Sequence, residues 1–299
     1  MSVVFKQLAI LYIFLLAGFS IGKWKKDKAS HADILSVLIV NIFLPCKVFS
    51  TFANNVTVSY ITEKYNLILV AVLLLLILVV IAQFLSRILT KDAYERRVFQ
   101  YSIPIANYAY LGYTLIGSVF GERMLADFML FAIPFVFYTY TVGYVLLTGG
   151  GNPLKKLLNP MTAAIILGIS AGLSRIQLPS MLTSVVSMAS ACVGPLTMIL
   201  TGITLSTFAV KELLGDKKSY IFSFLRLVGF PAVAYIICRI AHLDAFLPMI
   251  LIITCMPCGL NTIVFPKLVG EDCTLGARLA LITHVLSLAT LPLWLSIIL

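Results

Sequence analysis

The feature that most constrains this chain is a series of long apolar runs, of which Tyr65 to Leu85 is the clearest. That run consists almost entirely of Leu, Ile, Val and Ala, and about 20 such residues are needed to cross the hydrocarbon core of a bilayer. Only 11% of the 299 residues are charged, far fewer than the surface of a soluble domain needs. The chain is therefore predicted to be an all-α integral membrane protein.

Charged residues and Pro/Gly-containing breaks divide the apolar sequence into ten predicted transmembrane helices joined by short loops. The run from Leu8 to Gly22 is similar to a signal-peptide core, but its positive charges follow the run instead of preceding it. We therefore interpret it as part of the first transmembrane helix. The predicted spans are 5–22, 33–52, 66–87, 98–120, 124–147, 160–176, 181–205, 219–241, 247–269 and 277–298.

Lys and Arg residues are concentrated in alternate loops, and this bias predicts the orientation of the chain. The odd-numbered loops hold most of them, so these loops are expected on the cytoplasmic side of the cytoplasmic (inner) membrane, with both termini outside. The net charge of +10 follows from this distribution and does not indicate nucleic acid as a partner. The basic residues of the odd loops are Lys23, Lys25, Lys26, Lys28, Arg87, Lys91, Arg96, Arg97, Lys155, Lys156, Lys211, Lys217, Lys218, Lys267 and Arg278.

A glycine-rich segment at the midpoint predicts how the chain is organised. Residues 149–153 read Gly-Gly-Gly-Asn-Pro and form an expected flexible linker between residues 1–148 and 154–299, with five spans on each side. An odd number of spans in each half means that the second half enters the membrane from the opposite side. The sequence therefore predicts two inverted five-helix repeats, an organisation typical of secondary transporters.

Prolines recur at corresponding places in the two halves. Pro104 is followed by Asn107 in the fourth span, and Pro257 is followed by Asn261 in the ninth; both spans end in Gly-Glu. Pro45 and Pro195 similarly stand at corresponding places in the second and seventh spans. Proline removes a helical hydrogen bond, so the fourth and ninth spans are predicted to be broken helices that cross near the middle of the membrane. Half-helix N-termini at such a crossing suit an anion.

At these residues the sequence resembles the auxin efflux carrier family, in particular its bacterial organic-acid permeases. The segment Asn107 to Thr114 with its closing Phe120-Gly121-Glu122 is similar to a first-half signature of that family. Met256-Pro257 with Asn261, the ending Leu288 to Trp294, and Asn159-Pro160 are similar to further signatures. The chain differs from the family pattern at three positions, which are Ala106, Thr114 and Lys47.

The resemblance implies a fold of the type found in NhaA and the bile-acid symporters. In that fold the third to fifth and eighth to tenth spans form a mobile transport domain, and the other spans form a scaffold. It also implies a homodimer as a plausible assembly in the lipid bilayer, and a small organic anion as the transported partner.

Polar residues within the predicted spans are the candidates for substrate contact. Asn107 and Asn261 follow the proline breaks, where an amide either donates to a carboxylate or satisfies freed backbone groups. Lys47 lies mid-span, where a charge costs about 3 kcal/mol or more, so it is expected to face water, a partner or an anionic substrate, or to snorkel toward the outer face. The predicted substrate-binding residues are Asn107, Asn261, Pro104, Pro257, Lys47, Gly112, Thr114 and Thr262.

Two further polar residues in the spans are interpreted as structural. Arg226 lies early in the eighth span and is expected to snorkel to the cytoplasmic edge. His284 is expected to be a hydrogen-bonded packing residue, with a proton relay as the alternative. Cys255 and Cys258 have the spacing of a redox motif without its βαβ context, so no cofactor, metal or catalytic residue is predicted.

These observations predict a secondary transporter that moves a small organic anion, such as a mono- or dicarboxylate, by alternating access. All Asp and Glu residues lie in loops or near span ends, so little or no sodium dependence is expected. A sodium-coupled symporter of the bile-acid type and a non-transporting membrane sensor remain the alternatives. The motifs of intramembrane proteases are absent, which argues against an enzyme.

Overall fold

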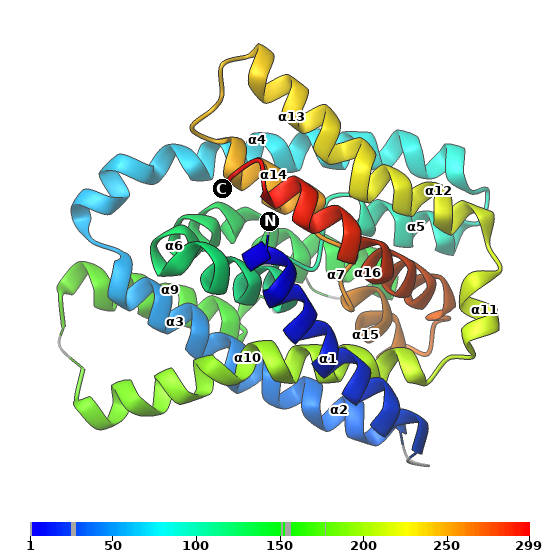
Figure 1. Cartoon of the computed structure of the whole chain (residues 1–299), viewed down its shortest axis with the longest axis horizontal. Coiled ribbons are helices and arrows are strands. Elements are labelled where there is room, and N and C mark those ends of the chain that lie inside the picture. The colour runs from blue at the N-terminus through cyan, green and yellow to red at the C-terminus, as the bar shows by residue number, and fades with distance from the viewer. Residues whose placement is uncertain (1, 25–27, 151, 153–156, 177) are drawn as a thin grey trace.

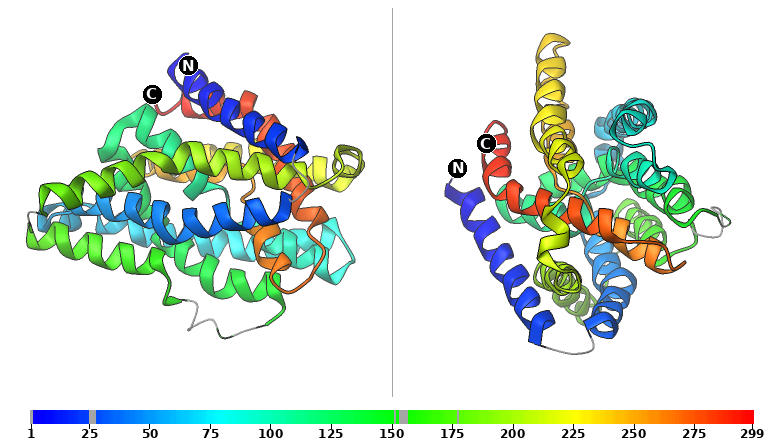
Figure 2. Two further views of the ribbon diagram at one scale, coloured as in Figure 1. Left: turned by 90° about the horizontal axis from the view of Figure 1, so that it is seen from below. Right: turned by 90° about the vertical axis from the view of Figure 1, so that its right-hand side faces the viewer.

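The computed structural model describes residues 2–24, 28–150, 152, 157–176 and 178–299 of the chain. The named elements in these ranges are all helices, and most of them run roughly parallel to the long axis (Figure 1). The beginning of α1 (Ser2–Trp24) and the end of α16 (Thr274–Leu295) lie side by side in all three views (Figures 1 and 2). Several residues used for the sequence predictions lie outside the described residues: Lys25, Lys26, Gly151, Pro153, Lys155 and Lys156.

Short π-helical turns, labelled η, interrupt the longer helices of both halves. After α1, the first half contains α2 (Lys28–Leu38), η1 (Ile39–Phe43), α3 (Leu44–Asn55), α4 (Val58–Leu89), α5 (Ala93–Ser102), η2 (Tyr108–Gly112), α6 (Tyr113–Tyr138), η3 (Thr139–Gly143) and α7 (Tyr144–Thr148). Before α16, the second half contains α9 (Pro160–Ser174), α10 (Ser180–Ser206), α11 (Val210–Leu214), α12 (Lys217–Phe224), η4 (Leu225–Gly229), α13 (Phe230–Ile240), α14 (Leu247–Cys255) and α15 (Asn261–Lys267).

Within the described residues, seven helical stretches are long and apolar enough to cross a membrane, and α9 is a shorter apolar helix. The expected fourth and fifth spans merge into one stretch, Tyr108–Thr148, which bends at Gly121, where φ is +84°. The expected ninth span is divided into α14 and α15, each too short to cross a bilayer alone. The count is seven instead of ten because the expected fourth and fifth spans are continuous across the bend, the ninth is divided, and α9 has only 15 residues. The bend itself lies between the expected end of the fourth span at residue 120 and the expected start of the fifth at residue 124.

Prolines explain two of the π-helical turns. Pro45 and Pro231 lie just after η1 and η4, and each removes one hydrogen bond from the helix that precedes it. The carbonyl four residues before Pro231 belongs to Leu227, and it accepts a 2.8 Å hydrogen bond from the indole of Trp294 in α16. A polar group freed by the proline is thus satisfied by a neighbouring helix, as an apolar environment requires.

Small residues bring two pairs of helices into backbone contact. A methyl group added at Gly202 of α10 would overlap the Leu15 carbonyl of α1. A methyl group added at Gly172 of α9 would likewise overlap the Val56 carbonyl that follows α3. Glycine at these positions therefore lets α1 pack on α10 and α9 pack on α3 at close range.

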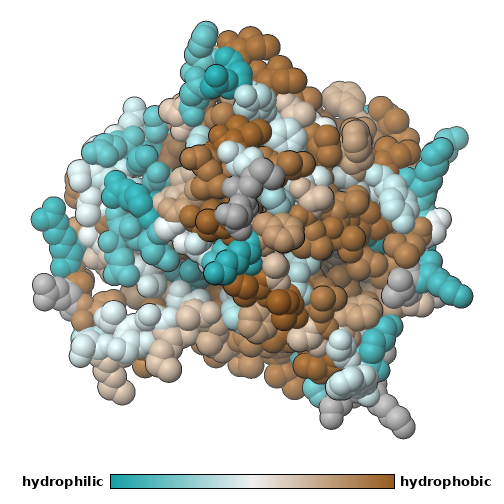
Figure 3. All heavy atoms as spheres, in the orientation of Figure 1, coloured by the Kyte–Doolittle hydropathy of each residue, from teal (hydrophilic) through white to brown (hydrophobic). Residues whose placement is uncertain are grey.

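Hydrophilic residues lie mostly around the edges of the face shown in Figure 3, while hydrophobic residues cover much of its middle. Ion pairs between different loops join either two odd-numbered or two even-numbered loops, which agrees with the predicted alternation of the loops between two sides. The odd-loop pairs are Lys267–Asp33, Arg97–Glu271 and Lys218–Glu95, and the even-loop pair is Lys64–Asp127.

Candidate functional site

The two broken helices meet at their breaks. Ala106, between α5 and η2, pairs with Cys258, between α14 and α15, in an isolated antiparallel bridge. The backbone N–H of Asn107 donates a 2.7 Å hydrogen bond to the carbonyl of Pro257. Both Pro104 and Pro257 are buried at this crossing. The prolines that interrupt the helices therefore leave extended backbone, and the two extended segments partly satisfy each other.

Asn107 is held by the last helix of the chain. Its side chain is 3% exposed, and Nδ2 lies 3.0 Å from Nε2 of His284 in α16. Nδ1 of the same ring lies 2.7 Å from the carbonyl of Ala280. This carbonyl is an acceptor only, so we assign the proton to Nδ1, and Nε2 then accepts from the Asn107 amide. His284 is thus a hydrogen-bonded residue that orients Asn107.

Asn261 is held in the reciprocal way. Its Nδ2 donates a 2.9 Å hydrogen bond to the hydroxyl of Tyr101, which is buried near the end of α5. An asparagine of each half is therefore anchored by a side chain of the other half: Asn107 by His284, and Asn261 by Tyr101. The sequence reasoning missed Tyr101, because a tyrosine in an apolar run carries no signal of its distant partner.

Asn107 and Asn261 line the same small cavity at the crossing. Its volume is about 30 Å³, which corresponds to about one water molecule. The crossing is thus closed to an organic molecule in this conformation. The cavity is lined by Leu44, Ile105, Ala106, Asn107, Tyr108, Ala109, Tyr110, Val136, Thr139, Tyr140, Met161, Gly259, Leu260 and Asn261.

Arg226 does not snorkel to the membrane edge, and that prediction is wrong. Its side chain is 0% exposed and lies against both broken helices. Nη1 donates to the carbonyl of Ile103 at 2.7 Å, Nη2 to Ile253 at 3.1 Å and Nε to Met256 at 3.0 Å. Ile253 lies four residues before Pro257, so its carbonyl is the one that the proline leaves without a helical donor. The carbonyls freed at the breaks therefore hold the guanidinium inside the helix bundle.

A threonine of α16 completes the crossing. The hydroxyl of Thr283 accepts a 3.0 Å hydrogen bond from the backbone N–H of Cys258. Thr283 was also missed by the sequence reasoning, since threonine is common in transmembrane helices. α16 therefore contributes two adjacent residues, Thr283 and His284, that fix the extended segments of the crossing.

Three other predicted site residues lie near the crossing but have structural contacts. Gly112 is buried against Phe128 and Met256. The Thr262 hydroxyl donates to the carbonyl of Gly259 at 3.0 Å. Thr114 packs against Gly194 of α10, and its buried hydroxyl has no hydrogen-bond partner within the described residues.

Lys47 lies away from the crossing cavity and is not one of the described residues that line it. A methyl group added at Gly117 would lie 3.9 Å from Lys47 Nζ and 3.7 Å from Glu122 Oε1. The ammonium and the carboxylate are therefore near neighbours, close to the bend at Gly121. Attraction of substrate by Lys47 stays a prediction, and Lys47 does not line the crossing cavity in this conformation.

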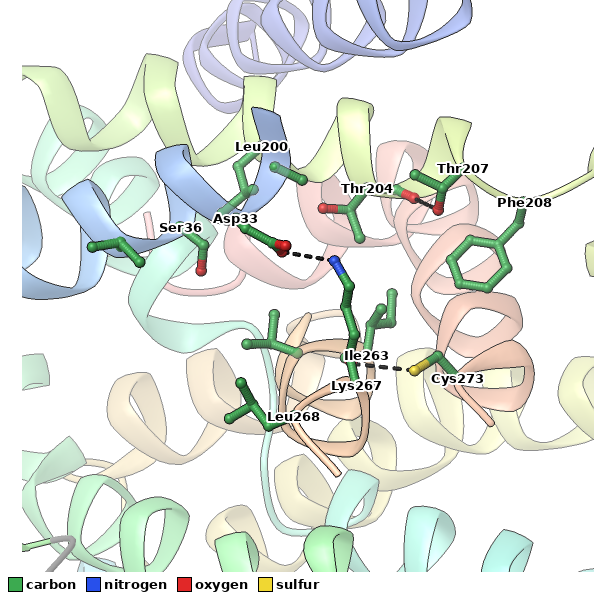
Figure 4. A pocket seen from close by; sticks show the side chains of 13 residues that line it. Asp33, Ser36, Leu200, Thr204, Thr207, Phe208, Ile263, Lys267, Leu268 and Cys273 are labelled. Carbon is green, nitrogen blue, oxygen red and sulfur yellow. Dashed lines mark hydrogen bonds and ion pairs between the residues drawn. The ribbon is translucent and has the colours of Figure 1, made fainter. Parts of the chain in front are cut away.

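A larger cavity lies between α2 and α10 on one side and α15 on the other (Figure 4). Its volume is about 540 Å³, and Lys267 forms a 2.7 Å ion pair with Asp33 beside it. Figure 4 shows this ion pair joining α2 to the end of α15, with Thr204, Thr207 and Phe208 above it and to its right. Cys273, whose thiol donates to the carbonyl of Ile263 at 3.3 Å, also lines this cavity.

Comparison with known proteins gives one family and one relative. The family described as "Membrane transport protein" matches residues 3–156 and 149–295. An uncharacterized transporter of Methanocaldococcus jannaschii is 28% identical over 296 residues, which cover 95% of this chain and 96% of the relative.

Proposed function

The chain belongs to the membrane transport protein family, which includes auxin efflux carriers, and it is a transporter and not an enzyme; on this basis we propose that it carries a small organic anion by alternating access. The observation that carries this proposal is the reciprocal anchoring of Asn107 and Asn261 around one cavity at the crossing. Amide N–H groups donate hydrogen bonds to a carboxylate, and here two amides from different halves are held on a common surface.

The small size of the crossing cavity supports a mechanism with at least one further conformation. A volume of about 30 Å³ excludes a mono- or dicarboxylate, so the substrate enters only after helices around the crossing have moved. The larger cavity lies between α2 and α10 on one side and α15 on the other, which is where the two proposed groups of helices meet. We assign α1–α3, α9 and α10 to a scaffold, and the broken helices with α4, α12, α13 and α16 to a moving transport domain.

The helix contacts support the inverted repeat that underlies this assignment. The first span of each half packs on the second span of the other half, since α1 contacts α10 and α9 contacts α3. The two breaks also occupy corresponding positions, in the fourth and ninth expected spans. Two inverted halves joined near residues 149–153 are consistent with both relations.

The membrane orientation is part of the same proposal. The loops that carry most of the basic residues face the cytoplasm, so both termini face outward from the cytoplasmic membrane. With this orientation the larger cavity lies toward the cytoplasm. Assembly as a homodimer is proposed on the basis of the family resemblance alone.

The decisive experiment measures flux across a membrane. The purified protein is reconstituted into liposomes, and counterflow of labelled indole-3-acetate, butyrate, malonate and malate is measured with sodium or choline as the cation. The proposal expects saturable counterflow of at least one acid. It also expects that Asn107→Ala and Asn261→Ala each raise the half-saturating concentration about tenfold, which corresponds to loss of one hydrogen bond to a charged group.

Asn54→Ala is the matched control, because the Asn54 amide is exposed and, within the described part of the chain, bonds only to Ser50 of its own helix. Counterflow that requires a sodium gradient would instead favour a symporter of the bile-acid type. Saturable binding of an acid without any flux would favour a sensor. Flux that both asparagine variants leave unchanged would remove the crossing from the proposal.

A further inference from the structure

Arg226 is a buried cation whose hydrogen-bond acceptors are all uncharged. Its three nitrogens donate to the carbonyls of Ile103, Ile253 and Met256, one from the first broken helix and two from the second. None of the ion pairs between described residues involves Arg226. A guanidinium keeps its proton in proteins, so the crossing carries a fixed positive charge.

The carbonyls that Arg226 binds are of the kind that coordinates a cation in other carriers. In transporters with broken helices, unwound backbone carbonyls and the C-terminal ends of half-helices coordinate sodium. Here the three carbonyls lie at the C-terminal ends of α5 and α14 and converge on one side chain. The guanidinium therefore fills the position that a coupling cation would take.

We propose that Arg226 is a built-in substitute for a coupling cation, and that its charge holds an organic monoanion at the crossing without sodium. This inference rests on the proposed function, because it names the charge class of the substrate at the same site. The empty crossing carries one positive charge, and a bound monoanion makes it neutral. A dianion would leave one uncompensated negative charge in an apolar environment, which is costly.

Arg226 is close enough to the crossing cavity for its charge to matter. Ile103, which it contacts at 2.7 Å, is two residues from Ile105, which lines the cavity. Two residues span at most about 7 Å, so the guanidinium lies within about 10 Å of the wall of the cavity. At this distance, with an effective dielectric constant of about 20, removal of the charge weakens binding of a monoanion by about tenfold.

The first test uses the wild-type protein and sodium. Thermal stability of the full chain in detergent is compared in sodium chloride and in choline chloride, each with and without indole-3-acetate, butyrate or malonate. The proposal expects the same stability in both salts and a larger stabilisation by a monocarboxylate than by malonate. A requirement for sodium, or a stronger effect of malonate, would overturn it.

The second test removes the charge and leaves the carbonyls. Arg226→Gln is expected to bind the stabilising acid about tenfold more weakly, while binding of its uncharged amide, indole-3-acetamide or butyramide, changes less than about twofold. The vacated carbonyls are expected to accept sodium, so the variant gains a stabilisation by sodium that the wild type lacks. Arg226→Lys keeps the charge and is expected to keep the preference for acid over amide.

The outcomes separate Arg226 from the rest of the site. An Arg226→Gln protein that keeps the full preference for acid over amide refutes the proposal. If Arg226→Gln does not fold, a folded Arg226→Lys protein that loses this preference refutes it equally. If no acid binds the wild type, the proposed function fails, and the response of Arg226→Gln to sodium still decides whether Arg226 replaces a cation.

Discussion

The contact between α1 and α10 allows a quantitative prediction. A methyl group added at Gly202 would overlap the carbonyl of Leu15 and lie 2.5 Å from the backbone nitrogen of Phe19, whereas ordinary contacts of this kind are 3.4–4 Å. The obstructing atoms are backbone and have no rotamer to change. The variant Gly202→Ala therefore requires the two helices to separate by about 1 Å, which loosens the dispersion contacts along their interface.

The magnitude follows from two opposing effects. Overpacking of this kind lowers the free energy of unfolding by up to about 3 kcal/mol, and replacing glycine by alanine in a helix raises it by about 1 kcal/mol. The net loss of stability is about 2 kcal/mol. The corresponding fall in melting temperature is about 5 °C for a chain of this size.

Gly229→Ala is the matched control. The nearest atom to a methyl group at Gly229 is Cδ2 of Leu225 at 3.3 Å, the flexible tip of a side chain. Both variants are purified in the same detergent, and their melting is followed by tryptophan fluorescence. The control is expected to melt at or above the wild-type temperature. Since α1 and α10 both belong to the proposed scaffold, flux per folded molecule of Gly202→Ala is expected to remain near wild type. A Gly202→Ala protein as stable as the control would refute the reasoning.

The crossing and the larger cavity give three more predictions. Tyr101→Phe removes the acceptor of the Asn261 amide. It is expected to raise the half-saturating concentration in counterflow about 3- to 10-fold with little change in maximal rate. An unchanged half-saturating concentration would show that the bond is dispensable. Asp33→Asn breaks an exposed ion pair, so the free energy of unfolding is expected to fall by at most about 1 kcal/mol. Maleimide labelling of Cys273 is expected to accelerate, because α2 is then free to separate from α15. Slower labelling than in the wild type would contradict this. Burial, followed by the Asp272 carboxylate, raises the pKa of the Cys273 thiol. Its labelling rate is therefore expected to keep rising with pH beyond the range, above a pKa of about 8.5, in which a free cysteine levels off; a plateau in or below that range would oppose it.

The sequence alone determined the features that depend on neighbours along the chain. A long apolar run crosses a bilayer wherever it occurs, and alternating basic loops group the loops into two sets. The breaks at Pro104 and Pro257 were also predictable, because proline disrupts the helix that contains it. The crossing of these breaks agrees with their predicted pairing, since Asn107 donates to Pro257.

Only the tertiary structure decided where the polar side chains of the site go. Arg226 binds carbonyls on two other helices, and the sequence shows neither that those carbonyls lack donors nor that they converge on one point. Asn107 finds His284 177 residues away, and Asn261 finds Tyr101 160 residues away. In an apolar environment a buried polar group forms hydrogen bonds with the partner that the fold brings within reach, because leaving it unpaired costs several kcal/mol. Hydropathy along the sequence determines where the helices form, and the pairing of buried polar groups determines how the side chains of the site are arranged.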